Sequence, residues 1–362
     1  MIAQDPPAPR PAGSLRPLLA TAAGMVICAC VLMALTRGAA IFLPLAEALI
    51  VWFVLNRFAA TLRRLPLGGR HLGHGASIAL AAGFVTLLGF VAVYSGVRSI
   101  LASGASPLGL QSSLDPIAAR LSLILGADIG SVINGVFDSM GLERLMQQLV
   151  LGMLGLLNQF GIVALYVAFL LADQALFPAK LGALFPDPAR RAAAEALLAE
   201  LGARISSYLW IMTRLSVLVA AASWLAMTLF GLPNALFWAL LIFGLNFIPT
   251  IGSVLGVLLP VAYAILQFAD LGPVLMLALV LGAVQFVAGN ILMPRLAGQS
   301  LNISMVVTVF ALFFWGTLWG VTGMFLAVPV TAMIVIVAAR FEATRPIAVL
   351  LSRTGRFEPA PG

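Results

Sequence analysis

The chemically useful residues of this chain are polar groups and helix breakers set inside long apolar runs. The uncharged run 215–269 holds an amide, two hydroxyls and a proline within eight consecutive positions. Proline removes a helical hydrogen bond and so frees a backbone carbonyl. Such groups suit a polar, uncharged solute, for example a small furanosyl diol, and do not suit a strong anion; alternatively, they only shape a tight turn between packed helices. The residues are Asn246, Pro249, Thr250, Gly252 and Ser253.

Two further groups of residues extend this hypothetical solute path. One follows at 285–302, where amides and hydroxyls surround Arg295: Gln285, Asn290, Gln299, Ser300 and Asn302, with Pro294 closing the apolar run. The other breaks the last apolar run at Gly316, Gly323 and Pro329. We expect Asn290 to line the path. Arg295 is either part of a polar cluster that faces the first one or an anchor at the membrane interface.

One carboxylate, Glu47, lies inside a predicted span. An ionisable group in hydrocarbon is costly and therefore a default functional candidate. Glu47 could carry a proton, with Arg214 and Arg295 as further candidates for ion coupling. Alternatively, Glu47 pairs with Arg98 or Arg214, or lies close enough to the interface to stay hydrated.

The sequence does not favour catalysis, cofactor or metal binding, or a disulfide. The chain lacks a Walker-type glycine loop, a zinc-protease helix and any nucleophile–base pair within a span, so we expect neither an enzyme nor a cofactor. His71 and His74 lie among glycines with no third ligand nearby, which does not favour a metal site. Cys28 and Cys30 point to different faces of one helix, so a disulfide between them is not expected.

Composition defines the class of protein. The chain has 362 residues, 62% hydrophobic and 9% charged, whereas a soluble domain has about 25% charged residues. This predicts an all-α integral membrane protein. The net charge of +7 comes from basic residues between apolar runs, which is typical of membrane topology rather than of nucleic-acid binding.

The order of apolar and charged segments predicts the organisation. A connector with Arg57, Arg63, Arg64 and Arg70 contains no acid and should be cytoplasmic, which places both termini inside. The predicted segments are a disordered N-terminus (1–16), frame spans one to three (17–101), an extracytoplasmic amphipathic segment (102–148), span four (149–172), a cytoplasmic amphipathic helix (173–206), a transport core (207–339) and a cytoplasmic tail (340–362).

Two apolar segments are too long for simple spans. As one helix, residues 234–269 would extend about 54 Å at 1.5 Å per residue, against a hydrocarbon core of about 30 Å. Residues 304–339 have the same excess, and both segments carry breakers near their centres. We therefore predict two re-entrant helical hairpins. Two tilted spans would also return the tail to the same side and remain an alternative.

The chain carries a series of specific short motifs: GLP at 231–233, NFIPTIGS at 246–253, GNILMPR at 289–295, GQSL at 298–301, FWG at 314–316, GM at 323–324 and LAVPVT at 326–331. In these motifs it resembles the autoinducer-2 exporter family of bacterial membrane proteins. The order of spans and of the charged middle segment agrees too. The C-terminal half carries the specific motifs, and the N-terminal half matches in layout.

The resemblance implies a permease of the bacterial inner membrane with roughly eight hydrophobic segments, forming a homo-oligomer in the lipid bilayer. It also implies export of a small-molecule solute such as autoinducer-2, or sodium/proton antiport in some members. Many members carry an acid where this chain has Met293, which argues against cation coupling at that position. The leading hypothesis is a solute exporter; the alternatives are a cation/proton antiporter and a non-transporting membrane scaffold.

Overall fold

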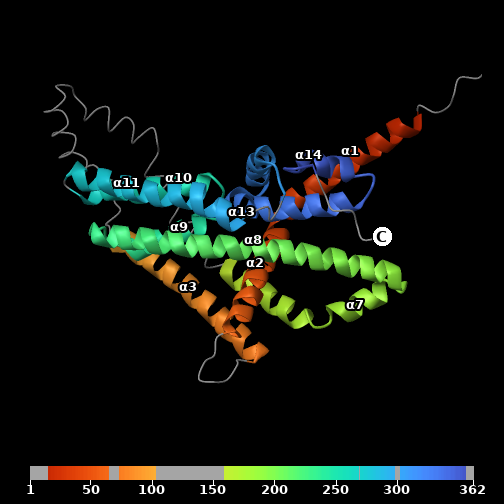
Figure 1. Ribbon diagram of the computed structural model, residues 1–362, viewed down its shortest axis with the longest axis horizontal. Helices are drawn as coiled ribbons and strands as arrows, with labels where there is room; N and C mark the ends of the chain where they lie inside the picture. The colour runs from red at the N-terminus through yellow and green to blue at the C-terminus, as the bar shows by residue number, and fades with distance from the viewer. Residues whose placement is uncertain (1–14, 65–72, 103–158, 269, 298–301, 356–362) are drawn as a thin grey trace, which may run out of the picture.

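The structure is a computed structural model that describes residues 15–64, 73–102, 159–268, 270–297 and 302–355 (Figure 1). Within these ranges the chain is helical, apart from one isolated β-bridge between Ile303 and Ser352. The chain begins with α1 (Leu15–Arg37), α2 (Ala39–Leu62) and α3 (His74–Ala102). These three helices correspond to the predicted frame spans. The predicted segment 102–148 and the first part of span four lie almost entirely outside the described residues.

The longest helix, α8 (Pro188–Leu229), runs through the middle of the molecule. The Asp187 carboxylate caps its N-terminus by accepting from the Ala189 amide at 3.1 Å, as expected for an aspartate followed by proline at the first helical position. From Pro188 onward, the predicted cytoplasmic helix (173–206) therefore continues without a break into the first part of the predicted transport core (207–339), as one helix of 42 residues. A helix at Gln159–Asp173 precedes it and bends by 68° into α7 (Phe177–Leu184).

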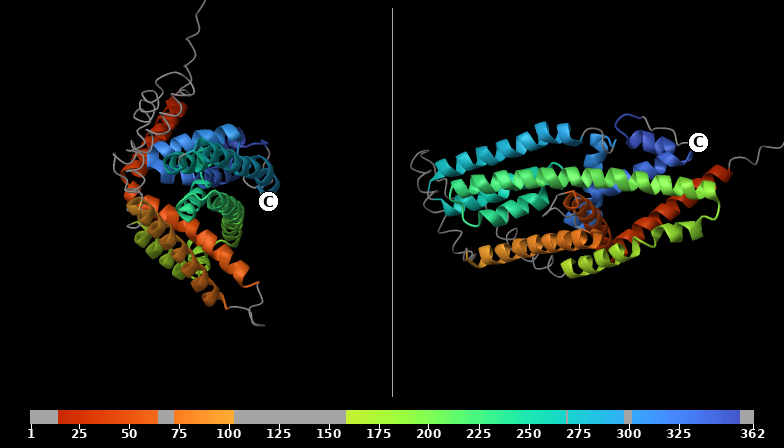
Figure 2. Two further views of the ribbon diagram at one scale, coloured as in Figure 1. Left: turned by 90° about the vertical axis from the view of Figure 1, so that its left-hand side faces the viewer. Right: turned by 60° about the horizontal axis from the view of Figure 1, so that its bottom comes forward.

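Helices lie on both sides of α8. In Figures 1 and 2, α3 and α7 lie on one side and α11 on the other. Short α9 (Ala235–Leu245) packs along α8. It is followed by α10 (Ile251–Gln267) and α11 (Leu271–Val287), then by the π-helical turn η1 (Ala288–Leu292) and α12 (Met293–Ala297).

Helices α9 and α10 form an antiparallel hairpin, which agrees with the first predicted hairpin. The Trp238 and Tyr263 rings lie 5.1 Å apart between centroids, although they belong to opposite legs. At the turn, a Cβ added to Gly252 would lie 1.8 Å from the carbonyl oxygen of Leu245. Only glycine allows the two legs to approach this closely.

Helix α13 (Met305–Arg340) is likewise folded back on itself, with non-helical backbone at Trp319 and Gly320. The Trp315 Nε1 donates to Thr331 Oγ1 at 3.1 Å, whereas 16 residues of straight helix would separate them by about 24 Å. A Cβ on Gly323 would lie 1.9 Å from the Trp315 carbonyl oxygen. The fold-back has the helical-hairpin shape predicted for residues 304–339. The re-entrant insertion of both hairpins into the membrane stays a prediction. A short α14 (Arg345–Leu351) then packs against α13.

The helices have the length and composition of membrane spans. Among the described residues, five helices are long and apolar enough to cross a bilayer, or six if the bent pair at 159–184 counts as one span. The predicted total of about eight hydrophobic segments includes residues outside this part of the chain. Large apolar side chains project outward, among them Leu229, Leu275 and Phe310, each more than 60% exposed. This outer surface suits lipid.

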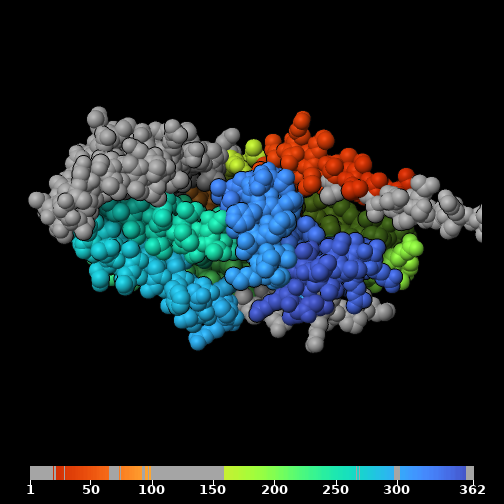
Figure 3. Space-filling model, turned by 90° about the horizontal axis from the view of Figure 1, so that it is seen from above, coloured from red at the N-terminus to blue at the C-terminus, as the bar shows by residue number. Residues whose placement is uncertain are grey.

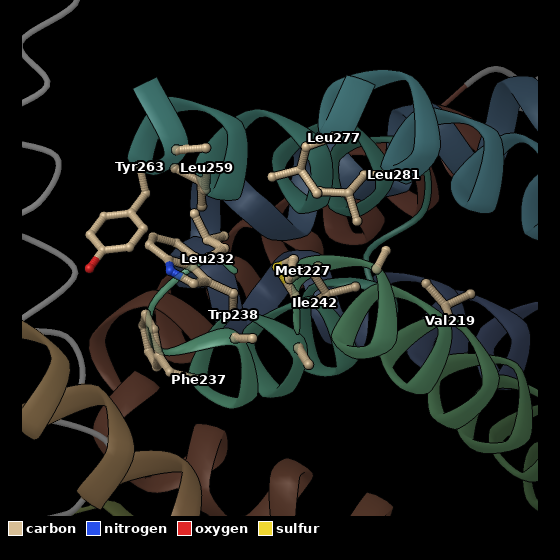
Figure 4. Packing of buried hydrophobic residues seen from close by; sticks show 14 of the residues in the cluster. Val219, Met227, Leu232, Phe237, Trp238, Ile242, Leu259, Tyr263, Leu277 and Leu281 are labelled. Carbon is tan, nitrogen blue, oxygen red and sulfur yellow. The ribbon is translucent and has the colours of Figure 1, made fainter. Parts of the chain in front are cut away.

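Three apolar clusters hold the helices together. One joins α8, α9, α10 and α11 around Trp238, Ile242 and Leu277 (Figure 4). The second joins α2 and α8 to both hairpins, and the third joins α2 and α3 to the helix at 159–173. Seen from above, α13 lies between the α10–α11 end of the molecule and α14 (Figure 3). The second cluster contains residues of both hairpins, so it lies where the two hairpins meet.

Candidate functional site

The tip of the first hairpin is a tight, strained turn. Thr250 has φ 67° and ψ −57°, and the Ile251 amide donates to the Pro249 carbonyl at 2.7 Å. This is a γ-turn of the rare kind, which is unfavourable for a β-branched residue. Its hydroxyl-bearing neighbour Ser253 donates back to the Thr250 carbonyl at 2.8 Å. Strain of this type often accompanies functional backbone.

Asn246, at the end of α9, links this tip to α8. Its Nδ2 donates to Ser216 Oγ at 3.0 Å, and Ser216 is fully buried. The amide of Asn246 is half-buried, while Thr250 is exposed. The tip therefore has one polar group held against α8 and others that face outward.

The tips of the two hairpins contact each other. The rings of Phe247, on the first tip, and Phe325, on the second, lie 4.9 Å apart between centroids. Phe247 and Ile248 share an apolar cluster with Trp319. Met293, which begins α12, packs against this cluster too. The broken segments of both hairpins, distant in sequence, thus meet at one place.

The second tip is also bound to the frame helices. Trp319 Nε1 donates to the Leu35 carbonyl of α1 at 3.0 Å. The carboxylate of Glu47, on α2, interacts with the hydroxyl of Thr322 just beyond the break. Gln159 Nε2 donates to the same carboxylate at 2.9 and 2.8 Å. Glu47 therefore pairs with two neutral side chains rather than with Arg98 or Arg214.

Within the described part of the chain, three buried polar atoms near the first hairpin have no hydrogen-bond partner: Ser223 Oγ, Trp238 Nε1 and Gln285 Nε2. Gln285, on α11, is 7% exposed. Its Nε2 lies 2.9 Å from the position that a Cβ on Gly256 would take, so the glycine leaves room for the amide. Unpaired buried donors are costly.

The remaining predicted residues do not gather into one cluster. Asn290 is exposed and donates to the Phe286 carbonyl of its own helix at 3.1 Å. Pro294 and Arg295 are exposed, and exposed Arg214 lies 5.9 Å over the Trp210 ring. Asn302 binds Thr354 near the end of the chain. Gln299, Ser300 and His71 lie outside the described residues. Pro329 is buried, and Gly316 packs against Met324.

Sequence reasoning missed several residues of this region. Ser216, Gln159 and Thr322 are small or neutral polar residues within apolar helices. Polar side chains in spans tend to bond across helices, so their presence was a signal. Their partners depend on packing between distant segments, which the sequence pattern did not define. The bond from Trp319 Nε1 to the Leu35 carbonyl likewise depends on packing between segments 284 residues apart.

Together these features describe a multi-pass α-helical membrane protein with two helical hairpins that meet at their tips. The chain belongs to the AI-2E transporter family, whose model matches residues 19–342. The relatives in this family are transport proteins, and the predicted family is confirmed.

Individual relatives support this assignment. A putative transport protein of Borreliella burgdorferi is 32% identical over 222 residues, which cover 61% of each chain. The AI-2 transport protein TqsA of Escherichia coli is 30% identical over 240 residues, 66% of this chain and 68% of TqsA. The putative transport protein YhhT of Escherichia coli is 37% identical over 147 residues, 41% of this chain and 42% of YhhT.

Proposed function

We propose that this protein is a secondary transporter that exports a small, polar, uncharged solute across the bacterial inner membrane. The observation that carries the proposal is the meeting of two broken hairpins at Phe247 and Phe325. Broken helices at the interface between repeated elements are a common location for transporter solute sites. The similarity to TqsA makes autoinducer-2 the first solute to test.

The polar groups near the first hairpin would form the solute path. Asn246 and Gln285 supply amides and Ser223 supplies a hydroxyl, while Ser216 holds the Asn246 amide in place. Among the described residues, Gln285 Nε2 and Ser223 Oγ have no hydrogen-bond partner. None of these groups carries a full charge, so they suit a hydroxylated solute better than an ion. Asn290, Pro294 and the glycines at 316 and 323 would contribute to opening the path rather than to binding.

Transport requires the hairpins to move against the frame of α1, α2, α3 and the helix at 159–173. Re-entrant insertion would place both tips at membrane depth, where free backbone groups are tolerated only inside protein or beside water. We expect both termini to be cytoplasmic, and the working form to be a homo-oligomer as the family resemblance implies. Cross-linking in native membranes, which preserves neighbouring subunits, tests the oligomer.

The test of the solute path is flux from proteoliposomes. Asn246→Ala should reduce autoinducer-2 flux by at least about tenfold, which is the effect of losing one or two hydrogen bonds to the solute. The matched control is Ser216→Ala, which removes the partner of Asn246 but leaves its amide in place. Flux should survive in this control. Equal losses in both variants would mean that the Asn246–Ser216 bond only supports the fold.

A further inference from the structure

Glu47 lies where three elements meet. It belongs to α2, one of the five helices long enough to span a bilayer. Gln159 Nε2 approaches both carboxylate oxygens, at 2.9 Å to Oε1 and 2.8 Å to Oε2. This places the amide nitrogen in the fork of the carboxylate. The contact joins two helices of the frame and holds the carboxylate in one orientation.

The third element is the second hairpin. Thr322, whose hydroxyl interacts with Glu47, is two residues beyond Gly320, where φ is 62° and the helix breaks. One residue before that break, Trp319 donates to the Leu35 carbonyl of α1. The tip is therefore held to the frame by two polar contacts, and of these two only the Glu47 contact contains a titratable group.

Among the described residues, no charged side chain pairs with the negative charge of the Glu47 carboxylate. The groups that act on it are the neutral side chains of Gln159 and Thr322, and no ion pair to Glu47 is present in the part of the chain that the structure describes. The elements around α2 carry further described titratable side chains. They are Arg37 on α1, Tyr94 and Arg98 on α3, Tyr166 and Asp173 on the helix at 159–173, Arg190, Arg191, Glu195, Glu200, Arg204, Tyr208 and Arg214 on α8, and Arg340 on α13.

We infer that Glu47, Gln159 and Thr322 form a proton-controlled latch that fixes the tip of the second hairpin to the frame. The ionised carboxylate accepts from both the amide and the hydroxyl. One proton taken from water converts one carboxylate oxygen to a hydroxyl, which removes an acceptor site and the negative charge that strengthens both bonds. The protonated carboxyl group holds the hairpin tip less tightly than the ionised one, and loss of the proton restores the tight contact.

The inference deepens the proposed function, and the flux measurement described below rests on that function. The latch itself can be tested without any solute, by measuring the distance between the hairpin tip and the frame. In a protein with Cys28 and Cys30 replaced by alanine, nitroxide labels are attached to two introduced cysteines. Phe169→Cys lies on the frame and Val321→Cys lies at the tip, and the native side chains there are 61% and 67% exposed. Pulsed electron paramagnetic resonance then measures the distance between the two labels in nanodiscs, with the labelled protein diluted by unlabelled protein. Samples are frozen at about pH 8 and about pH 5, a range in which buried carboxylates titrate.

The parent protein should shift to a longer distance at the lower pH. Glu47→Gln and Thr322→Val should show the longer distance at both pH values, since each weakens the latch independently of protonation. The control Glu195→Gln changes an exposed acid of α8 and should behave like the parent protein. An unchanged distance in the parent protein, or the parent's short distance in Glu47→Gln, overturns the latch.

Flux distinguishes this inference from the proposed function. If the protein moves solute, its rate should rise toward lower pH, and this pH dependence should vanish in Glu47→Gln. A pH dependence that persists in Glu47→Gln counts against the latch while leaving the transporter intact. Absence of flux in every variant, together with the expected distance changes, counts against the proposed solute transport and leaves the latch standing.

Discussion

Single residues set the geometry of both hairpin tips. Gly320 has φ 62° and ψ −143°, close to a region of backbone space that only glycine occupies readily. Thr250 occupies positive φ at the other tip and carries the strain that a β-branched side chain brings there. The second tip therefore uses glycine to make its break, while the first holds threonine in a conformation that its surroundings must stabilise.

The role of Gly320 can be tested by adding one methyl group. Gly320→Ala should destabilise the protein by about 1–3 kcal/mol because of backbone strain, since a Cβ at this position would meet nothing within 4 Å. The matched control is Gly282→Ala on α11, where space is equally open and the backbone is helical. Thermal unfolding in detergent should show a loss for the first variant and no loss for the second. Equal midpoints would mean that the break does not need glycine.

The elements of the fold were largely predictable, and their contacts were not. Length and central breakers sufficed for both hairpins because a straight helix of that length does not fit a bilayer. The cap at Asp187 followed from local chemistry. In contrast, the bonds from Asn246 to Ser216 and from Glu47 to Gln159 join segments 30 and 112 residues apart. Such pairs depend on how helices pack, and the periodicity of an apolar sequence does not define that packing.

The legs of the second hairpin share one buried hydrogen bond. Thr331→Val removes the acceptor of Trp315 Nε1, both residues being less than 9% exposed. The indole N–H would then be buried without a partner, which costs about 1–3 kcal/mol. The control Thr317→Val alters an exposed threonine of the same hairpin that bonds only its own helix. A lower unfolding midpoint should appear in Thr331→Val alone. A similar small change in both variants would argue against this bond as a support of the hairpin.

On the scale of the whole molecule, α8 joins regions with different surroundings. At about 1.5 Å per residue it extends roughly 63 Å, about twice the hydrocarbon thickness. Its first half carries Glu200, which pairs with Arg204 at 3.0 Å and with Arg340 at the end of α13. Its second half is apolar and contains Arg214 as its one charged residue after position 204. The ion pairs therefore connect the charged half of α8 to the end of the second hairpin.

This division of α8 predicts where water reaches the helix. With Cys28 and Cys30 replaced, Ala196→Cys and Val217→Cys place single thiols on exposed positions of the two halves. A maleimide that cannot cross membranes reacts with the thiolate, which forms in water and not in hydrocarbon. Ala196→Cys should be labelled in inside-out vesicles and not in right-side-out vesicles, because the topology predicted from the basic connector at 57–70 places residues 173–206 in the cytoplasm. Val217→Cys should remain unlabelled in both, since lipid surrounds it. Labelling of position 217, or of position 196 from outside, would place α8 differently in the membrane and would move both hairpin tips with it.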